Sequence, residues 1–137
     1  MRSIAVDAGT IVAACGPNDR HHARVVAWLA GNRLPLITCW LAIGEAFHVL
    51  GYNQTKARNM VAWAARVMQI DEQTTVDVDR IVEVMEKYRD LPADLTDAAL
   101  LAMCERRGIR EIATLDSDFE VYRTKTRKAL VNVLAGP

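Results

Sequence analysis

Two aspartates end the stretch I-A-T-L-D-S-D-F at residues 112–119, directly after residues with the character of a buried strand. Acidic side chains at the end of a strand can hold a divalent metal ion, because hard cations prefer oxygen ligands. They can equally cap a turn or a helix, since Asp and Ser are common where a strand gives way to either. The positions of the other acids in the chain help to decide between a metal site and a cap.

Three further acids stand in apolar surroundings. Asp7 ends the strand-like stretch S-I-A-V, Glu45 lies within W-L-A-I-G-E-A-F-H-V-L, and Asp97 lies within L-T-D-A-A-L-L-A. A carboxylate is costly to bury unless it is paired or binds a metal. Each acid also has an ordinary explanation. Asp7 and Asp116 could cap the segments that follow them, and Asp97 could stabilise a helix start that Thr96 caps. Glu45 could be an edge residue of its helix or pair with an arginine.

Short strands alternate with apolar or amphipathic helices along the chain. The pattern predicts strands at 3–6, 34–38, 111–115 and 130–134, with a possible further strand at Ile70. It predicts helices at 8–15, 21–31, 40–50, 55–68, 77–88 and 96–107. This alternation is typical of the α/β class, with a mainly parallel central sheet of four to five strands and helices on both faces.

Open parallel sheets bind ligands at the carboxyl ends of their strands, near the point where the strand order reverses. Asp7 and Asp116 follow the first and the penultimate predicted strands, so we expect both at one edge of the sheet. Four acids near one edge are harder to explain by capping than any one of them alone. Mg²⁺ and Mn²⁺ prefer such hard oxygen ligands. Two such ions can activate a water and stabilise the leaving oxygen of a phosphodiester, so the sequence favours metal-assisted hydrolysis.

Composition narrows the class of protein further. The chain has 137 residues, of which 51% are apolar and 25% charged, and we expect one globular domain over residues 1–137. No apolar run approaches the roughly 20 residues that span a bilayer. The N-terminus has no signal-peptide pattern, so we expect a cytoplasmic protein without a membrane partner. The three scattered cysteines indicate reduced, buried thiols.

The net charge is zero, but the cations are unevenly distributed. Seven of them fall in one segment near the C-terminus: Arg106, Arg107, Arg110, Arg123, Lys125, Arg127 and Lys128. This run is either a basic surface beside the acids or an ordinary solvated face, and the sequence leaves both interpretations open.

The acids in their contexts resemble the PIN-domain family, and specifically its VapC-type ribonuclease toxins. The matching stretches cover most of the chain in the family's order: I-A-V-D-A-G-T-I-V-A-A, N-D-R-H-H-A-R, I-G-E-A, D-L-T-D-A-A-L-L-A and I-A-T-L-D-S-D-F. The resemblance implies a three-layer PIN-like fold with Mg²⁺ or Mn²⁺ at an acidic site. By position it implies these residues: Asp7, Glu45, Asp97 and Asp116 as catalytic metal ligands, Asp118 as an auxiliary ligand, and Thr10 and Thr114 as polar neighbours.

One departure concerns the third acid, because Asp94 lies three residues before Asp97 and either could fill that position. Asp97 is favoured because an apolar helix follows it at once. The resemblance further implies a metal-dependent endoribonuclease acting on tRNA or rRNA, an inhibiting antitoxin and a homodimer. The main alternative is a PIN-like module that binds RNA or protein without cutting. A receiver domain would want a lysine soon after a late strand, and the first one after residue 115 is Lys125. The stretch E-A-F-H at 45–48 has the Glu-x-x-His spacing of di-iron proteins, but these need a second such pair, which the sequence lacks.

Overall fold

Five parallel strands form one sheet in the order β3-β2-β1-β4-β5 in the computed structural model, which describes residues 2–91 and 94–135. β1 (Ile4–Val6) lies at the centre, between β2 (Leu36–Cys39) and β4 (Glu111–Ala113). β3 (Gln69–Asp71) and β5 (Val131–Asn132) form the two edges. The expected mainly parallel sheet is therefore confirmed, and Ile70 does lie in a strand.

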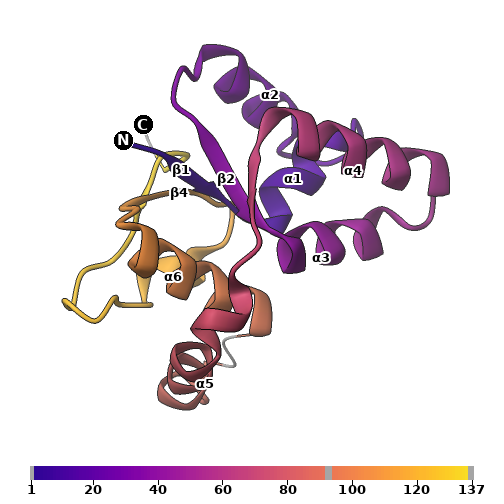
Figure 1. Cartoon of the computed structure of the whole chain (residues 1–137). Coiled ribbons are helices and arrows are strands. Elements are labelled where there is room, and N and C mark those ends of the chain that lie inside the picture. The colour runs from indigo at the N-terminus through magenta and orange to yellow at the C-terminus, as the bar shows by residue number, and fades with distance from the viewer. Residues whose placement is uncertain (1, 92–93, 136–137) are drawn as a thin grey trace.

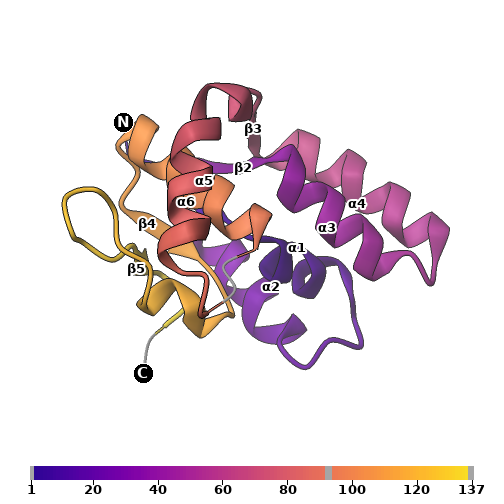
Figure 2. The same cartoon turned by 90° about the horizontal axis from the view of Figure 1, so that it is seen from below.

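Helices cover both faces of the sheet and connect its strands. They are α1 (Ala8–Cys15), α2 (His22–Gly31), α3 (Trp40–Leu50), α4 (Gln54–Val67), α5 (Val78–Lys87) and α6 (Leu95–Arg107), with short 3₁₀ turns η1 (Thr74–Asp77) and η2 (Ser117–Glu120). α1 and α2 lie on the side of the strands away from α5 and α6, and the α3–α4 pair projects outward (Figure 1). The same pair extends away from the sheet in the second view (Figure 2).

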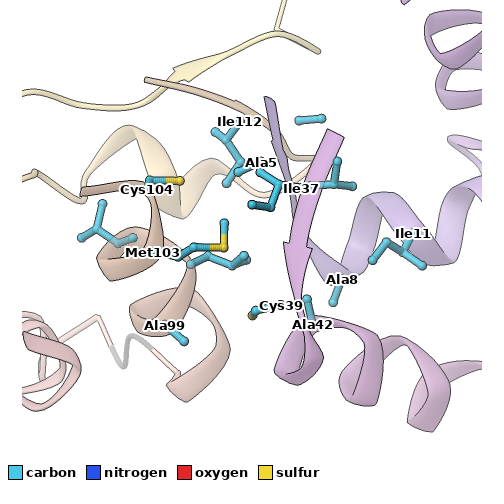
Figure 3. Close-up of a cluster of buried hydrophobic side chains, with 14 of the residues drawn as sticks. Ala5, Ala8, Ile11, Ile37, Cys39, Ala42, Ala99, Met103, Cys104 and Ile112 are labelled. Carbon is cyan, nitrogen blue, oxygen red and sulfur yellow. The ribbon is translucent and has the colours of Figure 1, made fainter. Parts of the chain in front are cut away.

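The core fills the space between the helical layers and the sheet. Every residue of β1 and β2 is buried, as expected for parallel strands covered on both faces. Figure 3 shows Met103 and Cys104 of α6 on one side of these strands, with Ile11 and Ala8 of α1 on the other. The expected three-layer fold follows from this packing.

Two helices, α4 and α6, begin one residue earlier than expected. Asn53 caps α4, because its Oδ1 accepts a hydrogen bond from the Lys56 backbone N–H at 3.1 Å. Asp94 caps α6 in the same way, accepting from the Asp97 backbone N–H at 2.7 Å. α6 ends at Gly108, whose positive φ of 69° suits a residue without a Cβ.

The strand order places a crevice at the centre of the sheet. From β1 the chain builds β2 and β3 on one side, and β4 and β5 lie on the other. The crevice therefore opens beyond the carboxyl ends of β1 and β4, where ligands bind in sheets of this kind. Within residues 2–91 and 94–135, no helix is both long and apolar enough to cross a membrane.

Candidate metal centre

A cleft of about 650 Å³ opens at this edge of the sheet. It brings together the four acids that the sequence analysis singled out, although they come from four separate segments. Two further acids share its wall, so that six carboxylates line one cleft: Asp7, Asp19, Glu45, Asp94, Asp97 and Asp116. The expectation that these acids converge is met by the geometry, whereas their role as metal ligands remains a prediction.

Asp7 connects the end of β1 to the start of α1. It is only 6% exposed, and its Oδ1 accepts a hydrogen bond from the Thr10 backbone N–H at 3.0 Å. Its Oδ2 accepts from the Thr114 hydroxyl. Burial raises the pKa of Asp7, while the hydrogen bonds from Thr114 and Thr10 act in the opposite direction. Asp7 therefore caps α1 and also lines the cleft, so a capping role and a metal-binding role are compatible for this residue.

The two threonines join the segments that carry the acids. The Thr10 hydroxyl donates to the Ala113 carbonyl at 2.9 Å, which ties α1 to β4. The Thr114 hydroxyl contacts Asp7 and also accepts from the Asp116 backbone N–H at 3.0 Å. The predicted place of both threonines beside the acids therefore agrees with their contacts.

Asp97, Asp116 and Asp118 form the tightest group of acids. One carboxylate oxygen from each lies within 4.8 Å of the others. The Asp116 Oδ1 also accepts from the Asp118 backbone N–H at 2.9 Å, which caps η2. All of the ligand atoms are carboxylate oxygens, the donor type that suits Mg²⁺ or Mn²⁺ better than a softer metal.

Burial and repulsion between the acids raise the pKa values of two carboxyl groups in the cleft. Burial, followed by the charge of Asp94, raises the pKa of Asp97 to about 7, with smaller contributions from Asp116 and Asp7. Burial and then the charges of Asp94, Asp7 and Asp116 raise the pKa of Glu45. A bound cation would remove this repulsion.

No cation in the described part of the chain neutralises these acids by an ion pair; the ion pairs there involve other carboxylates. The arginine partner that could have explained Glu45 is therefore absent from residues 2–91 and 94–135. Glu45 instead lies on an exposed part of α3 at the cleft, while Ala42, Ile43 and Ala46 bury the other face of the helix.

The structure gives Asp94 and Asp97 different surroundings. Asp94 is exposed, and its side chain caps α6. Asp97 is more buried and lies within reach of Asp116 and Asp118. This geometry supports Asp97 as the third acid, with Asp94 as a neighbouring charge that still lines the cleft.

Tyr122 contacts the site but was missed from the sequence. Its hydroxyl donates to the Asp97 Oδ2 at 3.2 Å, and its ring is buried. The ring packs edge-to-face on Phe119 and Tyr88, with centroids 5.2 and 5.1 Å away. The spacing of Phe119 and Tyr122 would have indicated a buried face, but no local pattern indicates a hydrogen bond to a residue 25 positions away.

Two more residues of the cleft come from the loop between α1 and α2. Arg20 and His21 lie in its wall, and the Arg20 Nε contacts the His21 Nε2 at 3.0 Å. Both residues fall in the stretch N-D-R-H-H-A-R, in which the sequence analysis named no site residue.

We expect Tyr122→Phe to weaken Mn²⁺ binding about tenfold, because it removes only the hydroxyl that holds the Asp97 carboxylate. Isothermal titration calorimetry would measure the affinity. Tyr88→Phe is the matched control, since its hydroxyl accepts from the Arg123 backbone N–H at 2.8 Å and does not touch an acid of the cleft. Equal loss of affinity in both variants would mean that Tyr122 acts only through packing.

The strand order and the acidic crevice are those of a nuclease-like α/β domain, and comparison with known proteins gives the family. The PIN domain model matches residues 4–125, so the chain belongs to the PIN domain family. None of the curated protein sequences matches it.

Two solved structures show the same fold. VapC20 of Mycobacterium tuberculosis, a toxin that cleaves the sarcin–ricin loop, is similar to this chain with a TM-score of 0.76 and 18% identity, over 86% of this chain and 93% of that one. FitAcB of Neisseria gonorrhoeae is similar with a TM-score of 0.55 and 18% identity, over 83% of this chain and 88% of that one.

Proposed function

We propose that this protein is a metal-dependent endoribonuclease and the toxin of a toxin–antitoxin pair. The observation that carries the proposal is the cluster of Asp97, Asp116 and Asp118 oxygens within 4.8 Å of one another. Two of these acids, Asp97 and Asp116, also line the cleft that holds Asp7 and Glu45. Membership of the PIN domain family supports nuclease activity. The likeness to a toxin that cleaves the sarcin–ricin loop supports RNA as the substrate, with rRNA and tRNA as the first targets to test.

The acids would share one task, which is to bind the metal. Asp7, Glu45, Asp97 and Asp116 would hold Mg²⁺ or Mn²⁺, with Asp118 as an additional ligand. The bound metal would supply an activated water and stabilise the charge on the leaving oxygen.

The neighbouring side chains fix the positions of these ligands. Thr114 and Thr10 hold the Asp7 carboxylate through two different oxygens. Tyr122 holds one oxygen of Asp97 and leaves the other free for a ligand. Such fixed carboxylates lower the cost of organising the site for each reaction cycle.

Cleavage of end-labelled RNA tests the proposal. The substrates would be an oligonucleotide carrying the sarcin–ricin loop and a set of tRNAs, with Mg²⁺, Mn²⁺ or a chelator. Discrete cuts should require the metal and disappear in Asp7→Asn and Asp116→Asn. If cutting persists in both variants or with chelator, it comes from a contaminant, and the non-catalytic binding module becomes the better description.

We also propose a homodimer in addition to an antitoxin partner. Exposed apolar side chains on α5 support this, because Val78, Val82 and Met85 repeat at helical spacing on one stripe and are 49%, 60% and 37% exposed. The molar mass measured by light scattering during gel filtration would test it, and a monomer at micromolar concentration would contradict it.

A further inference from the structure

The fold divides six of the seven cations between residues 106 and 128 into two groups, while the seventh, Arg123, donates to the Glu120 and Tyr122 carbonyls. Arg106 pairs with Asp71 at 2.7 Å and with Asp77 at 2.9 Å, and Arg107 pairs with Asp71 at 2.7 Å. These two arginines therefore lie at the β3 edge of the sheet and are held there by ion pairs. They do not contribute to a free basic surface.

The second group is exposed and consists of Arg110, Lys125, Arg127 and Lys128, which we call the basic patch. Within the described residues, none of the four forms an ion pair. Glu105, the acid that lines the same depression, is already engaged, since both of its oxygens accept from Arg80 at 2.7 and 2.9 Å. The patch therefore keeps its positive charge.

The loop between η2 and β5 carries Lys125, Arg127 and Lys128. It begins beside the acidic cleft and follows α6 away from it. The Tyr122 hydroxyl contacts Asp97 near the start of α6, and the Lys125 backbone N–H donates to Glu105 near its end, at 2.6 Å. Asp97 and Glu105 are eight residues apart, which is about 12 Å along a helix. Three of the four cations of the basic patch thus lie on a segment that starts beside the cleft, while the fourth, Arg110, directly precedes β4.

The patch borders a depression of about 590 Å³. Its floor includes Ile109, Leu130 and Val131, and its rim carries Arg110, Lys125 and Lys128. A rim of exposed cations around a depression suits a polyanion better than an apolar partner.

The turn of this loop holds an arginine in a conformation that favours glycine. Arg127 has a positive φ of 66°, enforced by hydrogen bonds from the Thr124 N–H to the Lys128 carbonyl at 2.9 Å and from the Arg127 N–H to the Thr124 carbonyl at 2.8 Å. A side chain at such a position costs stability, and a binding role for the guanidinium would account for an arginine there.

We propose that the basic patch binds phosphates of the RNA strand on one side of the scissile bond, along α6. This inference rests on the proposed function. Six carboxylates and only one arginine, Arg20, line the cleft, so its metal-free wall would repel a phosphodiester and most of the affinity for RNA has to come from cations outside it. The patch lies at the end of a segment that starts in the cleft, which favours the backbone of a bound RNA over an unrelated acidic protein as its occupant.

The test compares two triple variants that change the net charge equally. One is Arg110→Gln with Lys125→Gln and Lys128→Gln. The control is Arg33→Gln with Arg58→Gln and Arg66→Gln, three exposed cations of which two lie on α4, on the other side of the molecule from the loop (Figures 1 and 2). Cleavage kinetics and direct RNA binding, the latter by fluorescence anisotropy in chelator, would be measured over a range of KCl concentrations.

In the patch variant, three lost phosphate contacts should lower the slope of log affinity against log salt by about 2. KM should rise about tenfold or more near 0.1 M salt while kcat changes less than about twofold, since the acids are untouched. The control should change KM less than about twofold. Equal effects in both triple variants, or an unchanged salt slope in the patch variant, would overturn the proposal.

Arg127→Gly is a second variant that separates binding from folding. It relieves the backbone conformation, so the thermal midpoint should not fall, whereas KM should rise a few-fold. Failure of the proposed function is distinguishable, because wild-type protein would then cut no RNA at all. If the patch variant instead altered the molar mass and left RNA binding intact, the surface would be an interface between copies and the inference would be wrong.

Discussion

Asp97→Asn is expected to abolish RNA cleavage and, at the same time, to raise the thermal midpoint of the metal-free protein. Loss of a metal ligand should lower kcat/KM roughly a thousandfold or more. Burial and the charges of Asp94 and Asp116 already disfavour the Asp97 carboxylate in the folded state. Removing that charge should stabilise the metal-free protein by about 1 kcal/mol, or about 3 °C in a chain of this size.

The amide keeps the packing and one hydrogen-bond acceptor for Tyr122, so the change is mainly one of charge. Differential scanning calorimetry in chelator would give the midpoint. Addition of Mn²⁺ should then raise the midpoint of wild-type protein much more than that of Asp97→Asn, because only wild type binds the ion tightly in its folded state.

Two variants serve as controls for this prediction. Asp94→Asn keeps a side chain that can cap α6, and it should reduce activity far less than Asp97→Asn. Glu72→Gln changes an exposed acid that does not line the cleft, and it should alter neither activity nor midpoint. A lower midpoint with normal cleavage in Asp97→Asn would instead make Asp97 a structural residue of α6.

Local patterns were sufficient to predict the layers of the fold and the edge of the sheet where the acids meet. The short apolar runs before Asp7 and Asp116 fixed two strands, and the helical connections between strands forced the sheet to be parallel. Parallel strands end at a common edge, so the positions of these two aspartates followed without knowledge of tertiary contacts.

Contacts between distant segments could not be predicted in this way. The hydrogen bond from Tyr122 to Asp97 depends on how the loop after η2 packs on α6, which no periodicity reports. The cap of α6 was also misassigned, because Asp94 and Thr96 both suit a helix start and only the backbone geometry selects one. The roles of the acids as metal ligands remain predictions that the variants above would test.

The division of the basic run shows the same limit. Arg106 and Arg107 look like their neighbours in the sequence, yet they pair with Asp71, which lies 35 and 36 residues earlier. Charge along the chain predicts a basic segment, and only the packing of α6 against β3 decides which of its cations reach the surface.

Asp71→Ala is expected to cause a large loss of stability, although Asp71 lies outside the cleft. Its side chain is fully buried at the end of β3 and accepts from Arg106 and Arg107 at 2.7 Å each, and from the Gln73 backbone N–H at 3.2 Å. Truncation leaves two partly buried guanidinium groups without this partner. The free energy of unfolding should fall by about 3 kcal/mol, which urea denaturation would measure.

The pH dependence gives an independent check on Asp71→Ala. Burial alone would raise the pKa of Asp71, but hydrogen bonds from Arg106 and Arg107 outweigh it and hold the pKa below its usual value. A lowered pKa means that the carboxylate stabilises the folded state above the usual aspartate range and loses this effect as the pH falls through its folded value. The difference in the free energy of unfolding between wild type and Asp71→Ala should therefore be full at neutral pH and shrink in acid.

The control is Glu86→Ala, which breaks an exposed pair with Arg89 and should cost less than about 0.5 kcal/mol. A similar small cost for Asp71→Ala, or a cost that does not change with pH, would show that these charges contribute little to the attachment of α6 to the sheet.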